Sequence, residues 1–111
     1  DPNLRIVILR MKNAHHLDAT SVMSLEELIQ FMRQKDRDLI VSGARREVYR
    51  VFRDSGLLEI LGKENFFLES PRNPNISTRK ALMRAQEIIG EDQVPDIKIY
   101  YDPNKSQGRQ Q

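Results

Sequence analysis

The sequence contains no cysteine and no tryptophan, and aromatic residues make up only 6% of its 111 positions. Without cysteine there can be no disulfide framework, no thiolate metal site and no cysteine nucleophile, and a reducing compartment is permitted. Long apolar runs are also absent: none approaches the roughly 20 residues that a helix needs to cross a bilayer. Residues 1–3 do not resemble the start of a signal segment. We therefore expect a soluble chain in a cytosolic setting.

An excess of charge of one sign is lacking as well. The sequence has 18 Lys+Arg against 16 Asp+Glu, which gives a formal net charge of +2. Nucleic-acid binders usually carry a much larger basic surplus, so we expect no nucleic-acid partner. A chain of this length can bury roughly two-thirds of its extended surface. One compact domain is expected rather than two.

The hydrophobic pattern of the first half of the chain predicts an α/β fold. Residues 4–9 form a short, β-branched run that is typical of a strand buried on both faces. From Val22 the apolar positions recur at helical spacing and predict an amphipathic helix, with Leu28 in its core-facing stripe. Residues 39–41 form a second apolar run. Strand, helix and strand in this order predict a βαβ unit, and hence a sheet that is at least partly parallel with helices packed on it.

The second half continues this alternation. A short helix carries Val51 as a predicted core position and ends at Gly56, and residues 65–68 predict a third strand. After a loop, Ser77 is predicted to cap a further helix that ends at Gly90. Residues 97–101 are either a strand or an extended tail.

The organisation of the chain follows from these elements. We expect a domain over residues 1–90 and a C-terminal extension over residues 91–111. The last ten residues, 102–111, contain no large apolar side chain that could anchor them, so they are expected to be mobile.

The loop after the first strand is the most informative segment for function. In open α/β sheets, ligands gather at the carboxyl ends of the strands. Thr20 and Ser21 lie where free N–H groups of a helix would stabilise a phosphate, so a phosphorylation switch is one interpretation. The other is that Asp18, Thr20 or Ser21 simply caps the helix. A third pattern, Ser24 with Glu27, fits a capping box that would start the helix one turn later.

Other candidate groups are weaker. Ser42 and Gly43 precede a helix and could cradle a phosphate at its N-terminus, although no glycine-rich nucleotide loop is present, so any nucleotide binding should be weak. Arg45 and Arg46 begin a basic helix surface that fits either an anionic partner or solvent. The adjacent His15 and His16 are better explained as a solvated loop than as a metal site. We find no catalytic set and expect neither an enzyme nor a bound cofactor or metal.

Several segments together resemble a known family. They are Ile6-Val7-Ile8-Leu9-Arg10-Met11, Leu17-Asp18-Ala19-Thr20, Leu25-Glu26-Glu27-Leu28, Leu39-Ile40-Val41-Ser42-Gly43 and Phe52-Arg53-Asp54-Ser55-Gly56-Leu57. This series is similar to the STAS domain, which sulfate transporters share with anti-sigma factor antagonists. The closer likeness is to the C-terminal domain of SulP-type anion permeases. Family members begin with two strands and a helix ahead of the strand at residues 4–9, so the resemblance implies that these elements are absent from this chain.

The resemblance also implies roles for individual residues. Thr20 occupies the position of the serine that is phosphorylated in the antagonists, and Asp18 is the acidic residue of that motif. Ala19 and Ser21 stand where the antagonists usually carry a first hydroxyl and a glycine.

The function that the resemblance implies is regulatory. It predicts a non-enzymatic domain of a SulP-type sulfate or other anion transporter, on the cytoplasmic face of the membrane. Its expected partners are the transmembrane domain of the parent permease and either a cytosolic regulatory protein or a nucleotide. The alternative is a stand-alone anti-sigma factor antagonist controlled by phosphorylation.

Overall fold

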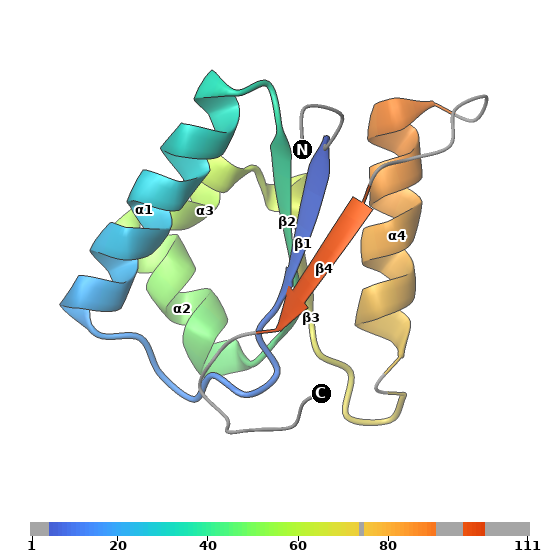
Figure 1. The fold of residues 1–111 in the computed structure, drawn as a ribbon. Coiled ribbons are helices and arrows are strands. Elements are labelled where there is room, and N and C mark those ends of the chain that lie inside the picture. Colours follow the sequence, from blue (N-terminus) through green and yellow to red (C-terminus); the bar gives the residue numbers. More distant parts are fainter. Residues whose placement is uncertain (1–4, 74, 91–96, 102–111) are drawn as a thin grey trace.

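The fold is a four-stranded sheet with helices on both faces (Figure 1). The computed structural model describes residues 5–73, 75–90 and 97–101. The strands are β1 (Ile6–Arg10), β2 (Asp38–Ala44), β3 (Phe66–Leu68) and β4 (Ile97–Tyr101), and the helices are α1 (Ala19–Gln34), α2 (Arg46–Ser55), α3 (Leu57–Leu61) and α4 (Ile76–Ile89), with a 3₁₀ turn η1 (Lys63–Asn65). The strand order is β3-β2-β1-β4, and every neighbouring pair is parallel. The predicted α/β class is confirmed, and the sheet of the described residues is parallel throughout rather than in part.

Alternation along the two central strands divides the core into two layers, because successive side chains of a strand point to opposite faces. Val7, Leu39 and Val41 pack against α1, α2 and α3, whereas Ile6, Ile8 and Ile40 pack against α4. Helix α4 meets the sheet through Ala81 and Ala85, which are four residues apart and fully buried. These small side chains let the helix approach the isoleucines closely.

The rotation of α1 differs from the prediction. Ile29 and Met32 are its buried residues, and Val22 and Leu25 pack partly against the same cluster. Leu28 is 37% exposed, so its assignment to the core was wrong. Residues 28 and 29 are only about 100° apart around a helix, so two adjacent apolar residues leave the direction of the buried face open. In α2, Val51 is half-buried, while Val48 and Phe52 carry the core contact.

The helix ends settle three predictions. Helix α1 begins at Ala19 with Asp18 as its N-cap, so the later start at the Ser24–Glu27 capping box was wrong. Gly56 ends α2 in the left-handed conformation with φ 89°, as its position predicted. Helix α4 begins at Ile76 after the N-cap residue Asn75, so Ser77 lies inside the first turn and is not the cap.

The C-terminal part of the described chain belongs to the sheet. Residues 97–101 form β4, which pairs with β1 in register from Ile6 opposite Ile97 to Arg10 opposite Tyr101. Of the two interpretations of this segment, the strand is correct. Leu4 and residues 102–111, for which a strand start and a mobile tail were predicted, lie outside the described residues. Over residues 5–73, 75–90 and 97–101, no helix has both the length and the apolar character needed to span a membrane.

Candidate functional site

The loops that follow β1 and β2 meet at the carboxyl edge of the sheet. Arg10 at the end of β1 is the register partner of Ser42, and the N–H of Met11 donates to the carbonyl of Ser42 at 2.9 Å. One step further, Nε of Arg45 donates to the carbonyl of Lys12 at 3.4 Å. Residues 18–21 follow β1, and residues 42–46 include the end of its hydrogen-bonded neighbour β2, so the two predicted segments lie at one edge of the sheet (Figure 1).

Asp18 fixes the start of α1. Its Oδ1 accepts the N–H of Ser21 at 2.8 Å, which satisfies one of the free donors of the first turn. This backbone hydrogen bond, helped by the hydroxyl of Ser21 and by the nearby His16, lowers the pKa of Asp18 below its ordinary value. Of the three capping candidates, Asp18 provides the cap. Ala19 and Thr20 begin the helix with exposed side chains, so the Thr20 hydroxyl is accessible.

A groove of about 480 Å³ runs along this start of α1. Its apolar walls come from β1, the following loop and the helix, and its polar rim includes the Thr20 and Ser21 hydroxyls. The lining residues are Leu9, Met11, Ala14, His16, Leu17, Asp18, Thr20, Ser21, Ser24 and Leu25. A groove of this composition can take up an apolar side chain of a partner while a polar group of the same partner contacts the hydroxyls.

Ser42 and Gly43 do not extend this surface. Ser42 is fully buried on the face of β2 that packs against α4, and within the described part of the chain its Oγ has no hydrogen-bond partner. Gly43 adopts φ +69°, and a Cβ placed on it would lie 3.2 Å from Nη1 of Arg10. Helix α2 begins after Arg45 without a side-chain cap. Ser42 and Gly43 are therefore buried parts of the carboxyl edge. The exposed residues that follow them are Arg45 and Arg46.

Sequence reasoning missed Arg10. Its side chain is only 6% exposed and lies on the α4 side, where it donates to Oγ of Ser77 at 3.3 Å and to Oγ1 of Thr78. Its guanidinium also lies 6.0 Å from the ring centre of Tyr101. A positional signal existed, because Arg10 follows Ile6 and Ile8 at period two and so shares their face. Arg10 ties β1 to the first turn of α4 and to the end of β4.

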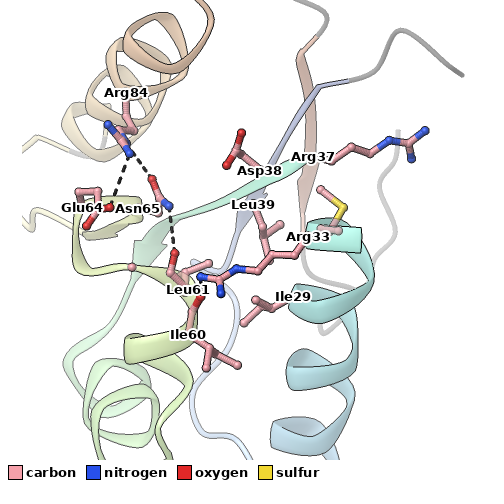
Figure 2. A pocket seen from close by; sticks show the side chains of 12 residues that line it. Ile29, Arg33, Arg37, Asp38, Leu39, Ile60, Leu61, Glu64, Asn65 and Arg84 are labelled. Atoms are coloured by element: carbon pink, nitrogen blue, oxygen red, sulfur yellow. Dashed lines mark hydrogen bonds and ion pairs between the residues drawn. The ribbon is translucent and has the colours of Figure 1, made fainter. Parts of the chain in front are cut away.

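A second cavity, of about 210 Å³, lies at the opposite, amino edge of the sheet. Figure 2 shows the chain of hydrogen bonds on its wall: Arg84 donates to Oδ1 of Asn65 at 2.8 Å, and Nδ2 of Asn65 donates to the carbonyl of Leu61 at 3.0 Å. Arg33 of α1 donates to the carbonyl of Ile60. These side chains satisfy carbonyl groups at the end of α3, where the helix leaves acceptors unpaired. The arginines of this cavity thus hold α1, α3 and α4 together.

The two histidines lie in the loop between β1 and α1, and both are exposed. Across the residues that the structure describes, no three His, Cys, Asp or Glu side chains gather in a way that could hold a metal ion.

Comparison with known proteins shows which family the chain belongs to. The family model of the STAS domain matches residues 1–71, which include both loops of the carboxyl edge. The chain belongs to the STAS domain family. It is also 35% identical over 65 residues to the chloroplastic sulfate transporter 4.1 of Arabidopsis thaliana. That match covers 59% of this chain and 10% of the plant protein, so the matched segment spans about a tenth of that relative's length.

Membership of the STAS family agrees with the order of elements from β1 to β3. The likeness to a sulfate transporter is distant and partial, whereas the family match over residues 1–71 includes the groove and the Asp18 cap. The resemblance seen in the sequence is confirmed at this level.

Proposed function

We propose that this STAS domain is a non-enzymatic regulatory module of a SulP-type anion transporter, placed on the cytoplasmic face of the membrane. The observation that carries the proposal is the 35% identity to a sulfate transporter over 65 residues, together with the STAS family match over residues 1–71, which include the carboxyl edge. The surface we assign to regulation combines the groove at the start of α1 with the exposed Arg45 and Arg46.

The chemistry of this surface suits contact rather than turnover. Asp18 is engaged in capping α1, and the exposed side chains of Thr20 and His16 and two exposed guanidiniums remain for contact with a partner. Arginine and hydroxyl groups around an apolar groove are typical of a protein interface. The partners we expect are the transmembrane domain of the parent permease, and a cytosolic protein or a nucleotide that competes for the same groove.

A stand-alone anti-sigma factor antagonist is the second candidate. The observation in its favour is the exposed Thr20 in the first turn of α1, where a phosphate would meet the positive end of the helix dipole. The length of the intact reading frame separates the two functions. Hydrophobic helices encoded upstream of residue 1 support the transporter, and a reading frame no longer than this domain supports the antagonist.

Substitution of Thr20 tests whether the surface regulates transport. Thr20→Glu places a carboxylate in the first turn of a helix, which the dipole tolerates or favours, so the isolated domain should melt at or above the wild-type temperature. In the intact permease the added charge lies on the proposed contact surface and should change the rate of anion uptake. Thr20→Val is the uncharged control.

The outcomes are distinct. Altered uptake in Thr20→Glu, with a normal melting temperature, supports regulation through this surface. Unchanged uptake in both variants, with a lower melting temperature in Thr20→Val, would mean that Thr20 has only a structural role. It would contradict the hypothesis that a charge at Thr20 regulates transport.

A further inference from the structure

Strand β3 forms the edge of the sheet that lies furthest from β4. Among the described residues, no strand pairs with its outer side. The N–H of Glu69 donates to the carbonyl of Ala44 in β2 at 2.8 Å, so the preceding residue, Leu68, directs its own N–H and C=O away from β2. An open edge of this kind is a template for another extended chain.

A groove of about 430 Å³ lies directly beside this edge. Its apolar and aromatic lining comes from α2, α3 and β3 and consists of Tyr49, Leu58, Phe66, Phe67 and Leu68. Leu68 is 40% exposed, so it adds apolar surface to the groove that a partner can cover. The floor is rigid, because the ring of Phe66 packs against Phe52 at 4.9 Å and Tyr49 at 5.7 Å between ring centres. The groove is thus already formed without a ligand.

The charged side chains that line the groove are of one sign. Lys63 of η1 and Lys80 of α4 line it, and no carboxylate does. Both lysines are exposed, and in the ranges that the structure covers neither takes part in an ion pair. The two ammonium groups come from elements on either side of β3, while the whole chain carries a net charge of only +2. This local excess selects for a negatively charged occupant.

We propose that the β3 edge binds an extended acidic segment of a partner protein as an added strand. The backbone of that segment pairs with Leu68, one of its apolar side chains enters the groove, and carboxylates on its other residues contact Lys63 and Lys80. Strand addition of this type draws affinity from main-chain hydrogen bonds and specificity from pockets for alternate side chains. This groove shares no lining residue with the groove at the start of α1, so the proposal does not depend on the regulatory role of Thr20.

A synthetic peptide tests this directly. The probe is the capped hexapeptide Ac-EVEVEV-NH2, titrated into the ¹⁵N-labelled domain while amide chemical shifts are followed. We expect the shifts to concentrate on β3, η1 and the part of α4 near Lys80. Two exposed ion pairs contribute together about 1 kcal/mol, so Lys63→Glu with Lys80→Glu should weaken binding roughly fivefold or more. Raising the salt from about 50 to about 500 mM should weaken wild-type binding too.

Matched controls keep the result interpretable. Lys12→Glu with Arg46→Glu changes the net charge by the same amount at the carboxyl edge and should leave binding unchanged. The peptides Ac-KVKVKV-NH2 and Ac-EVEPEV-NH2 should bind more weakly, because the first reverses the charge and the second keeps the three carboxylates but removes a backbone donor. Well-dispersed amide spectra show that each variant is folded.

Several results would overturn the proposal. They are shifts confined to other surfaces, no shift at millimolar probe, equal binding of the acidic and basic peptides, or equal binding of the proline peptide. Tighter binding of decanoate than of the peptide at the same residues would also overturn it, since the groove would then be a site for acyl carboxylates.

Discussion

The buried face of α1 gives a quantitative test of the fold. Ile29 is 3% exposed and packs under the sheet face formed by Val7, Leu39 and Val41, whereas its neighbour Leu28 is 37% exposed. Ile29→Ala removes three carbon groups, which is about 2.4 kcal/mol at about 0.8 kcal/mol per buried group. A cavity term adds to this, but Ile29 also lines the cavity at the amino edge, where water can enter. We expect a loss of about 3 kcal/mol for Ile29→Ala and at most about 1 kcal/mol for Leu28→Ala.

The measurement is urea and thermal unfolding of the two alanine variants beside the wild type, followed by circular dichroism. A loss of about 3 kcal/mol lowers the melting temperature of a domain of this size by roughly 10–20 °C, while Leu28→Ala should lie within a few degrees of the wild type. Because both variants lose helix-forming apolar residues to alanine at adjacent positions, differences in helix propensity are small. A larger loss for Leu28→Ala than for Ile29→Ala would mean that α1 is rotated by about 100° from the orientation described.

Three further predictions concern the carboxyl edge. Gly43→Ala should lower stability by about 1–2 kcal/mol in urea unfolding, because φ +69° strains an alanine and its Cβ would crowd Arg10; an unchanged midpoint would mean that the turn relaxes freely. Ser42→Ala should leave stability unchanged or raise it by up to about 1 kcal/mol, since it removes a buried Oγ that has no partner in the described part of the chain; a marked loss would reveal a partner. The pKa of Asp18 is lowered in the folded state, so its stabilisation is present above about pH 4 and is lost as the pH falls through the folded pKa. Melting curves of wild type and Asp18→Ala should therefore differ at neutral pH and converge in acid, and a constant difference down to about pH 2 would contradict the carboxylate's role.

The sequence predicted the parallel βαβ order because local patterns carry it. Short β-branched runs alternate with amphipathic stretches, and parallel strands need such crossovers. The C-terminal ends of the helices at Gly56 and Gly90 could also be predicted from the sequence, since glycine readily adopts a positive φ. The sequence could not predict whether Leu28 or Ile29 is buried. Both residues are apolar, and only the packing of α1 against β1 and β2 selects one of them.

Other features depend on contacts between residues far apart in the chain. The place of residues 97–101 in the sheet rests on pairing with β1, about 90 positions earlier, which no local pattern encodes. Ser77 is of a residue type that often caps helices, yet it lies buried in the first turn of α4, where Arg10 donates to it across 67 positions. The candidate site was predicted in its exposed parts, at residues 18–21 and 45–46, because loop order fixes which strand ends they follow. The buried roles of Ser42, Gly43 and Arg10 could not be predicted in this way, because they depend on how α4 packs against the sheet.

The most direct test of the regulatory proposal is anion uptake by the intact parent protein that carries Arg46→Glu. This exposed residue begins α2, where the helix dipole favours a carboxylate, so the domain should stay folded. The control is Arg79→Glu, which makes the same charge change at an exposed position of α4, in the helix layer on the opposite face of the sheet. We predict that sulfate uptake changes in Arg46→Glu at equal expression and melting temperature, and stays at the wild-type rate in Arg79→Glu. Wild-type uptake in both variants would contradict a regulatory contact at the carboxyl edge.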